Sequence, residues 1–248
     1  MTNNTDRLIA QLTDPDGTNR RHAALALGRE QDPSGTTATA LVERLATEAD
    51  SCVREDLTWA TVQHIDTALP QVLGMLTAQD ADTRRTGAHV LSKVGDPVHF
   101  DALAPLVSDA ASDVAIKAYR AVANTGRPEA LAVLATRLGD GDALQRDALT
   151  GAFAGFGEAA VPTLVEGLGS SDRDVRVHAA DALGHLGVDA VTATDALGAL
   201  ASDPDADVRL AAVAALGQFG PEAAAAVEGF RSDADRRVAA TASRLTVS

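Results

Sequence analysis

Six arginines recur along the chain at a nearly constant interval, and a row of guanidinium groups could bind anions. They are Arg20, Arg54, Arg84, Arg146, Arg176 and Arg209. Each lies beside a turn rich in aspartate, so each guanidinium could instead pair with turn carboxylates such as Asp174 or Asp207. The neighbouring aspartates favour this structural pairing over an anion-binding row. Ala115 stands at the corresponding place in one turn, so the pattern tolerates a missing arginine.

The histidines and the single cysteine give no pattern typical of catalysis or metal binding. No histidine has the His-x-x-x-His or His-Glu-x-x-His spacing of a zinc site. His178 and His185 could share one helix face, but two ligands do not make a metal site. Cys52 has no histidine at a spacing that would activate it, and we expect a partly buried, inert thiol. Because nucleophile-elbow and phosphate-loop motifs are also missing, we predict no catalytic residue, no metal and no cofactor.

The arginines belong to an internal repeat with a period near 31 residues. Its clearest copy, residues 203–217, reads Val-Arg-x-x-Ala-x-x-Ala-Leu-Gly behind an aspartate-rich turn, and residues 175–184 repeat it. The second residue of each Val-Arg pair, or its counterpart, stands at positions 20, 54, 84, 115, 146, 176, 209 and 237. We expect one domain, 1–248, whose approximate repeats are 5–35, 36–66, 67–97, 98–127, 128–158, 159–188, 189–220 and 221–248.

Each copy has the apolar spacing of two amphipathic helices. Val208, Ala212, Ala215 and Phe219 fall on one stripe of a helix. The first half of each copy carries leucines or valines three and four residues apart. A hairpin of this size cannot bury both apolar faces alone, whereas stacked hairpins can. The prediction is an all-α, right-handed α-solenoid of about eight helical hairpins, in which alanine and glycine let the second helices approach closely.

The repeat resembles a known family. The pattern Asp-x-Asp-x-Asp-Val-Arg-x-x-Ala-x-x-Ala-Leu-Gly is similar to HEAT-like repeats, specifically the short bacterial and archaeal repeats first named from phycobilisome lyases, and the resemblance covers about residues 5–245. The resemblance implies a scaffold that holds another macromolecule in its concave face; a minority of such proteins are enzymes. HEAT-repeat hydroxylases carry paired His-Glu dipeptides for a di-iron site, and no histidine here is followed by glutamate.

Positions that vary between copies are candidates for binding. We call the six repeated arginines the ladder arginines. Five residues after each of them, or after Ala115 in the copy that lacks one, the side chain lies away from the buried stripe, and this position holds Trp59, His89 and Arg120. Aromatic residues beside arginine are typical of interface hot spots. The predicted partner-binding residues are Trp59, His89, Tyr119, Arg120, Glu55, Asp56, Arg85 and Lys117. The alternative is that Trp59 and Tyr119 fill gaps between helices, because large aromatic residues are usually buried.

Charge and composition exclude several classes of protein. The formal net charge of -14 and a pI near 4.7 argue against an extensive nucleic-acid-binding surface. The sequence has no apolar run long enough to span a membrane and no export signal, so we predict a cytoplasmic protein. Abundant alanine, with arginine in place of lysine, favours a bacterial or archaeal source. We expect a monomer that binds a protein or peptide partner.

The predicted function is a non-catalytic scaffold that binds its partner on the concave face. Three alternatives remain: a subunit or chaperone of a lyase-like enzyme, a HEAT-like DNA-repair protein, and a regulatory module. Alkylpurine DNA glycosylases of the HEAT-like type need a basic groove, and this acidic chain offers only a local basic cluster of Arg84, Arg85, Lys117 and Arg120. The regulatory reading rests on a resemblance to HEAT-like parts that accompany MerR-type transcription regulators.

Overall fold

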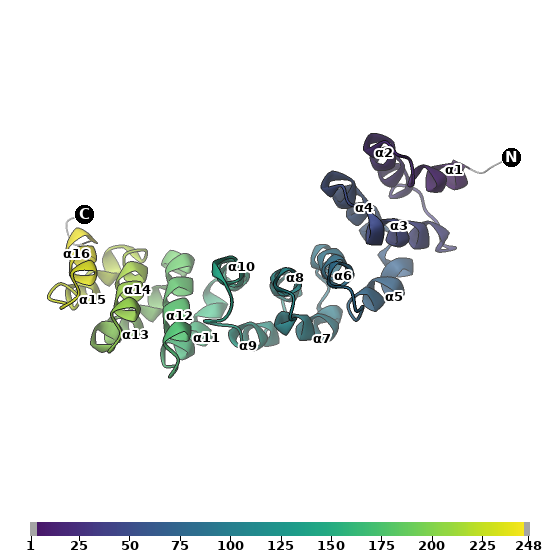
Figure 1. Cartoon of the computed structure of the whole chain (residues 1–248). Helices are drawn as coiled ribbons and strands as arrows, with labels where there is room; N and C mark the ends of the chain where they lie inside the picture. The colour runs from purple at the N-terminus through teal and green to yellow at the C-terminus, as the bar shows by residue number, and fades with distance from the viewer. Residues whose placement is uncertain (1–3, 246–248) are drawn as a thin grey trace. The chain divides into compact units, whose positions relative to one another are not determined.

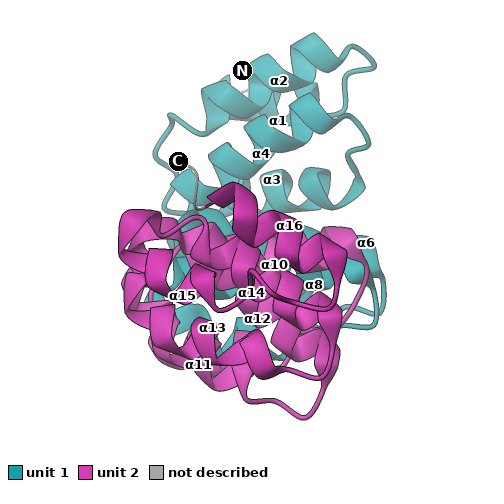
Figure 2. Cartoon of the chain, turned by 90° about the vertical axis from the view of Figure 1, so that its left-hand side faces the viewer, with its two compact units in different colours: residues 1–125 teal, residues 126–248 magenta. Residues whose placement is uncertain are grey.

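The computed structural model describes residues 4–245, and every regular element in that range is helical. The helices form eight successive hairpins, as the repeat predicts (Figure 1). They divide into two compact units, residues 1–125 and 126–248 (Figure 2). The prediction of an all-α fold built from about eight hairpins is therefore confirmed. The prediction that all eight form a single domain stays a prediction.

Unit 1 contains the first four hairpins. Three of them consist of two α-helices, while the first half of the fourth is a short α-helix between two 3-10 turns. The bounds are α1 Asn4–Gln11, α2 Gly17–Leu27, α3 Thr36–Thr47, α4 Ser51–Gln63, α5 Ile65–Met75, α6 Ala81–Val94, η1 Pro97–His99, α7 Phe100–Leu103, η2 Ala104–Ser108 and α8 Ser112–Asn124.

Unit 2 contains the other four hairpins, and 3-10 turns flank most of its first helices. The bounds are α9 Glu129–Ala135, α10 Ala143–Ala154, η3 Gly157–Ala160, α11 Val161–Leu168, α12 Arg173–Leu186, η4 Gly187–Ala193, α13 Thr194–Ala199, η5 Leu200–Ser202, α14 Ala206–Leu216, η6 Gly220–Ala223, α15 Ala224–Glu228 and α16 Arg236–Leu245.

Each unit has two layers of helices. The second helices of successive hairpins pack side by side in one layer, α2 to α8 in unit 1 and α10 to α16 in unit 2, and the first helices form the other layer (Figure 1). Leucine, valine and alanine from both layers fill the core between them. Many small contacts thus replace the few large aromatic contacts of an ordinary core.

Glycine and alanine let neighbouring second helices approach closely, as expected from the Ala-Leu-Gly motif. A Cβ atom on Gly28 would lie 3.0 Å from the Cα atom of Ala60 on α4. A Cβ atom on Gly184 would lie 3.0 Å from the Cα atom of Ala215 on α14. Since real Cβ atoms rarely approach other atoms so closely, larger residues at these positions would push the helices apart.

Aspartate caps the N-terminus of six second helices. Its side chain accepts a hydrogen bond from a backbone N–H of the first turn, where free donors favour a carboxylate. The capping residues are Asp16, Asp50, Asp80, Asp142, Asp172 and Asp205. The aspartate-rich turns of the sequence thus begin the helices that carry the ladder arginines.

Four ladder arginines join their own hairpin to the next one. The Nε and Nη2 atoms of each arginine donate to the two oxygens of one carboxylate, at 2.6–3.1 Å. That carboxylate belongs to the next hairpin and stands two residues before the N-cap position of its second helix. The Nη1 atom of the arginine donates to carbonyl oxygens five and six residues earlier in the chain. The pairs are Arg20–Glu48, Arg84–Asp109, Arg176–Asp203 and Arg209–Asp233.

These contacts confirm that the arginines pair with turn carboxylates, but the examples offered from sequence were wrong. Asp174 and Asp207 lie inside the first turns of α12 and α14, where they bind Arg173. The carboxylates that bind the ladder arginines lie earlier, in the loop. From there the same carboxylate also accepts the backbone N–H two residues later, so one side chain shapes the turn and holds the arginine.

Two ladder arginines have no carboxylate at this loop position. Ala78 occupies it for Arg54, which donates to Thr86 Oγ1 at 2.6 Å instead. Ser170 occupies it for Arg146, and its hydroxyl accepts the backbone N–H of Asp172 at 3.1 Å. Within the described residues, the guanidinium of Arg146 has neither an ion pair nor a hydrogen bond.

Replacing Ser170 with aspartate should supply the missing carboxylate for Arg146. We expect Ser170→Asp to raise the free energy of unfolding by about 1 kcal/mol, the size of one additional charged hydrogen bond after desolvation. Ser171→Asp, one residue away from the required position, is the matched control. Urea unfolding followed by circular dichroism measures both variants. An equal or smaller gain for Ser170→Asp than for the control would contradict this account of the ladder.

The ladder carboxylates should make the protein sensitive to acid. Burial opposes ionisation of Glu48 most strongly, but hydrogen bonds from Arg20, the Asp50 N–H and Arg44 outweigh it and lower the pKa of Glu48 from 4.5 to about 2. A lowered folded-state pKa contributes stability above pH 4.5 that is lost as the pH falls toward 2.

Glu48→Gln removes that titration and tests its contribution. We expect the variant to be less stable than the native chain at pH 7, and to lose less stability between pH 6 and pH 3. Thermal unfolding at a series of pH values measures the difference. If both proteins show the same pH dependence, Glu48 is not one of the titrating groups that stabilise the fold.

Candidate partner-binding surface

Trp59 is an exposed aromatic side chain on the second-helix layer of unit 1. It projects from α4 with 38% of its surface exposed, while the other large hydrophobic residues exposed to this degree or more in the described chain are aliphatic. The guanidinium carbon of Arg29 lies 5.9 Å from the centroid of its ring, within the range of a cation–π contact. The indole therefore combines an apolar face with a cationic neighbour.

Gly28, at the end of α2, provides the space for this indole. A Cβ atom at Gly28 would lie 2.5 Å from Cζ3 of Trp59. The ring therefore rests directly on the glycine backbone, and any larger residue would displace it. Trp59 thus has a defined position although more than a third of its surface is exposed.

Trp59, His89 and Arg120 share one register on adjacent second helices, α4, α6 and α8. One turn before Trp59 on α4 stands Glu55, which accepts a hydrogen bond from His89 Nε2 at 2.9 Å. Lys93, one turn beyond His89, places Nζ 3.7 Å from the other oxygen of Glu55. The three helices therefore present one mixed patch of aromatic and charged groups.

The pKa values of this patch reflect burial and crowding among its charges. Burial, followed by the charge of Lys117, lowers the pKa of His89 despite the nearby Glu55. Burial opposes ionisation of Glu55, but His89, Lys93 and Lys117 together lower its pKa. Near neutral pH, His89 is therefore uncharged and donates its Nε2 hydrogen to an ionised Glu55.

Two cations of α8 are left without a described ion pair or hydrogen bond, namely Lys117 and Arg120. Burial lowers the pKa of Lys117, and the charges of Arg120, Arg85 and Lys93 lower it further, with Glu55 acting in the opposite direction. Lys117 thus belongs to a cluster of like charges. We call the group formed by Trp59, Glu55, His89, Lys93, Lys117 and Arg120 the Trp59 surface.

The structure places the other predicted binding residues differently. Arg85 pairs with Asp82 at 2.9 Å and approaches Asp113 at 4.0 Å, and Asp56 pairs with Arg21 at 2.6 Å. These charges are largely compensated within the second-helix layer. Arg85 and Asp56 lie on the same helices as the Trp59 surface, α6 and α4, but are not part of it.

Tyr119 does not belong to this surface. It is 2% exposed and lies among the buried residues of α8, on the same stripe as Ala115 and Val122. The prediction that Tyr119 faces a partner is therefore corrected: it fills space between helices, the alternative that had been left open for both aromatic residues. Trp59, on the contrary, is exposed.

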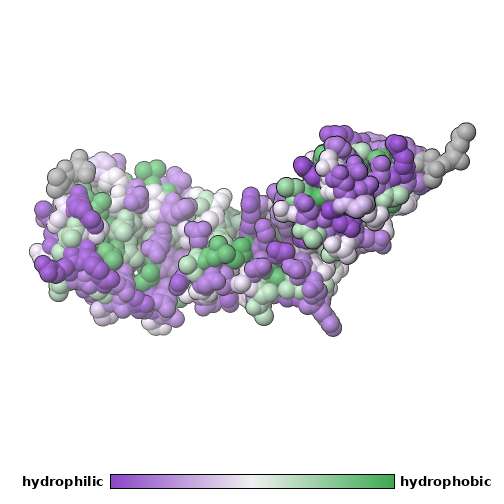
Figure 3. Space-filling view, turned by 45° about the horizontal axis from the view of Figure 1, so that its top comes forward, coloured by the Kyte–Doolittle hydropathy of each residue, from purple (hydrophilic) through white to green (hydrophobic). Residues whose placement is uncertain are grey.

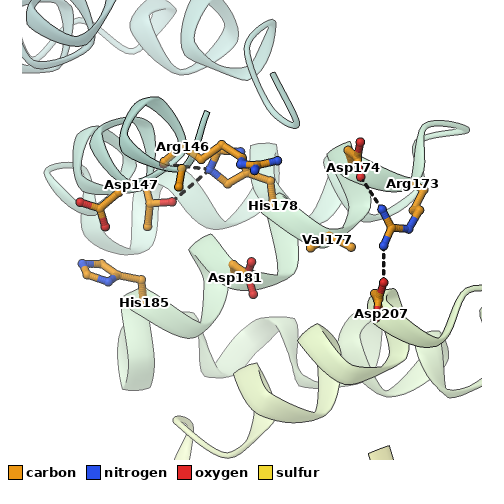
Figure 4. A pocket seen from close by; sticks show the side chains of 11 residues that line it. Arg146, Asp147, Arg173, Asp174, Val177, His178, Asp181, His185 and Asp207 are labelled. Atoms are coloured by element: carbon orange, nitrogen blue, oxygen red, sulfur yellow. Dashed lines mark hydrogen bonds and ion pairs between the residues drawn. The ribbon is translucent and has the colours of Figure 1, made fainter. Parts of the chain in front are cut away.

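Sequence reasoning missed a pocket in unit 2. A pocket of about 620 Å³ lies on the second-helix layer between α10, α12 and α14, and Arg146, His178, Asp181 and His185 are among its lining residues (Figure 4). His178, Asp181 and His185 stand two, five and nine residues after Arg176, in registers that also contribute to the Trp59 surface. Arg146 is itself a ladder arginine. The sequence therefore contained a signal for this pocket, but the pocket has no tryptophan or tyrosine of the kind that pointed to the Trp59 surface.

His178 fixes the wall of this pocket. Its Nδ1 accepts the backbone N–H of Gly139 at 3.1 Å, so Nε2 carries the hydrogen and faces the Arg146 carbonyl and Thr150 Oγ1, each at 3.1 Å. Burial lowers the pKa of His178, which is 3% exposed. Desolvation inside the hollow raises the pKa of Asp181, partly offset by Arg146. The histidine is thus a neutral structural link between α10 and α12.

Within the described residues, neither the Trp59 surface nor this pocket has the geometry of a metal site. Among residues 4–245, no three His, Cys, Asp or Glu side chains cluster in a way that could hold a metal ion. Cys52 is exposed at the start of α4, so the expectation of a partly buried thiol was wrong. The residue lies in the exposed first turn of the helix.

The visible surface of each unit is mostly hydrophilic, with small separate hydrophobic patches (Figure 3). No single helix within residues 4–245 is both long and apolar enough to cross a membrane. The pair Ala143–Ala154 and Gly157–Leu168, bent by 118°, meets the length and composition limits only when its two parts are taken together.

Comparison with solved structures finds similar helical repeats. A structure of Kap95p with RanGDP matches with a TM-score of 0.63 and 13% identity, over 98% of this chain and 40% of the other. The CpcE–CpcF complex of phycocyanin lyase from Nostoc sp. PCC7120 has a TM-score of 0.45 and 19% identity, over 100% and 95% of the two chains. Human deoxyhypusine hydroxylase has a TM-score of 0.42 and 20% identity, over 97% and 94%. At these identities the likeness concerns the fold alone.

The family comparison rests on the repeats themselves. Curated protein sequences give no significant match. The family model for HEAT repeats matches residues 69–154 and 161–245, which together make up more than half of the sequence. The chain therefore belongs to the HEAT repeat family.

Proposed function

We propose that this protein is a non-catalytic scaffold that binds a protein or peptide partner on the second-helix layer of unit 1, at the Trp59 surface. The observation that carries the proposal is the exposed indole of Trp59, held in place by Gly28 and Arg29. A rigid aromatic side chain loses little conformational entropy on binding, and tryptophan and arginine are the residues most enriched in interface hot spots.

The repeat architecture supports the same assignment. HEAT repeat proteins commonly bind protein partners, and stacked repeats offer extended surfaces for this purpose. In unit 1 the ladder contacts Arg20–Glu48 and Arg84–Asp109 hold neighbouring hairpins together. The second helices therefore present Trp59, His89 and Arg120 from a fixed frame, which reduces the ordering cost of binding.

The unused hydrogen-bonding capacity of the surface is suited to recognition. Lys117 and Arg120 can donate to a partner without first breaking a described contact inside the protein. The Glu55 carboxylate is already engaged by His89 and Lys93, so it contributes shape and local charge. An apolar centre with a polar rim is the usual anatomy of a protein interface.

Truncation of the indole tests this proposal directly. We expect Trp59→Ala to reduce capture of the natural partner about tenfold or more, because loss of a hot-spot tryptophan typically costs about 2 kcal/mol or more. The purified chain serves as bait for an extract of its native organism, and mass spectrometry with quantitative labels compares the captured proteins. Far-UV circular dichroism checks that the variant stays helical.

Leu144→Ala is the matched control, because Leu144 is a large hydrophobic residue of unit 2 with 64% of its surface exposed. It should capture the same proteins as the native chain. A Trp59→Ala variant that captures those proteins undiminished would show that the binding face lies elsewhere.

A further inference from the structure

We infer that the partner presents an acidic segment to unit 1, with an apolar side chain against Trp59 and carboxylates against Lys93, Lys117 and Arg120. This inference rests on the proposed function and specifies the chemistry of its partner. It depends on the distribution of charge over α4, α6 and α8, which differs from that of the chain as a whole.

The chain is strongly acidic, with 35 acidic against 21 basic residues. Lysine occurs only at positions 93 and 117. Both lysines therefore belong to the Trp59 surface, where Arg120 joins them and Glu55 is the single carboxylate. A local excess of positive charge on an acidic protein is the complement of an anionic ligand.

Internal contacts compensate this excess of positive charge only in part. Arg85, at the edge of the patch, has Asp82 and Asp113 nearby, and Lys93 shares Glu55 with His89. Within the described residues Lys117 and Arg120 have no such contact. Burial is the main cause of the lowered pKa of Lys117; Glu55 opposes the shift, and Arg120, Arg85 and Lys93 add to it.

A bound carboxylate would relieve the repulsion between these cations. Lys117 and Arg120 would donate charge-assisted hydrogen bonds to it in place of their hydrogen bonds to water. The ladder shows that arginines of this chain bind carboxylates with both nitrogens of the fork, as in Arg84–Asp109. Arg120 can therefore take a partner carboxylate by the same chemistry.

An acidic peptide fits this surface better than a nucleic acid does. The cationic cluster is short, and Asp56, Asp82 and Asp113 lie on the same second helices. A nucleic acid needs a continuous basic track along its phosphates, and these carboxylates would repel it. A peptide can place its carboxylates only where the cations stand and use an apolar residue at Trp59.

The helix spacing sets the length of such a segment. Neighbouring helix axes are about 8–10 Å apart, so the distance from α4 to α8 is on the order of 18 Å. A helical segment of about 12 residues spans that distance at 1.5 Å per residue. A synthetic 16-residue helical peptide with leucines at one end and glutamates at the other is therefore long enough to contact both ends of the Trp59 surface.

Fluorescence measurements with the full chain test the inference. Trp59 is the only tryptophan, so its emission reports binding at the surface itself, and anisotropy of a fluorescein label on the peptide gives the affinity. We expect the glutamate peptide to bind at 50 mM salt and to bind at least about tenfold more weakly at 500 mM salt. A matched peptide with glutamine in place of every glutamate should bind at least about tenfold more weakly at low salt.

Charge reversal identifies the residues responsible. Lys117→Glu with Arg120→Glu should weaken the glutamate peptide at least about tenfold. Arg236→Glu with Arg244→Glu is the matched control, because both arginines are exposed in unit 2 and the net charge changes equally. The control should bind as the native chain does. The milder pair Lys117→Gln and Arg120→Gln, checked by circular dichroism, covers the case in which reversal disturbs folding.

Several outcomes would overturn the inference. One is that the glutamate peptide does not bind at 1 mM, and another is that the glutamate and glutamine peptides bind equally well. The others are an equal loss of peptide affinity in the two charge-reversed pairs and tighter binding of a 16-base-pair DNA duplex than of the peptide. Capture of the natural partner separates the two proposals. If Trp59→Ala abolishes capture of the natural partner but charge reversal at Lys117 and Arg120 does not, the scaffold function is supported and the acidic partner is ruled out. If neither Trp59→Ala nor the charge reversal reduces capture of the natural partner, both the scaffold function at this surface and the acidic partner are ruled out.

Discussion

The contact on which both units depend is the bidentate pair between a ladder arginine and a loop carboxylate of the following hairpin. It is made four times with the same atoms and nearly the same distances, for example in Arg176–Asp203 and Arg209–Asp233. The arginine also holds the loop that precedes its own helix, and the carboxylate holds the loop that precedes the next. Each pair therefore fixes two turns and one helix-to-helix spacing at once.

This arrangement separates the residues that build the repeat from those that can vary. Apolar stripes, glycines such as Gly28 and Gly184, and the ladder pairs determine how second helices pack. Two residues after a ladder arginine the side chain can be buried between helices, as Thr86 and His178 are. Positions one and five residues after the six ladder arginines are not buried. They can therefore differ from hairpin to hairpin without changing the fold, as Trp59 and His89 do on α4 and α6.

The sequence predicts the fold well because the same pattern occurs eight times, so irregular copies do not obscure it. The site was harder to predict, because two side chains one position apart on a helix can differ completely in their exposure to solvent. Trp59 and Tyr119 differ in this way: Trp59 lies five residues after a ladder position and is exposed, whereas Tyr119 lies four after Ala115 and is buried. Likewise, the carboxylate partners of the arginines lie in the loops, which apolar periodicity does not describe.

Arg146 shows how the residue at one loop position decides whether a ladder arginine is paired with a carboxylate. Its helix, its capping aspartate Asp142 and its register match the other copies, yet Ser170 stands where four of them have a carboxylate. The guanidinium consequently lines the pocket of unit 2, beside Asp181. The cations without a described partner on α8 have a different origin. This helix has Ala115 at the ladder position, and Lys117 and Arg120 stand at positions that vary between copies of the repeat. On both α8 and α10, therefore, a cation without a described partner occurs on a helix that lacks the bidentate ladder contact, and a partner can bind there without competing with the contacts that hold the repeat together.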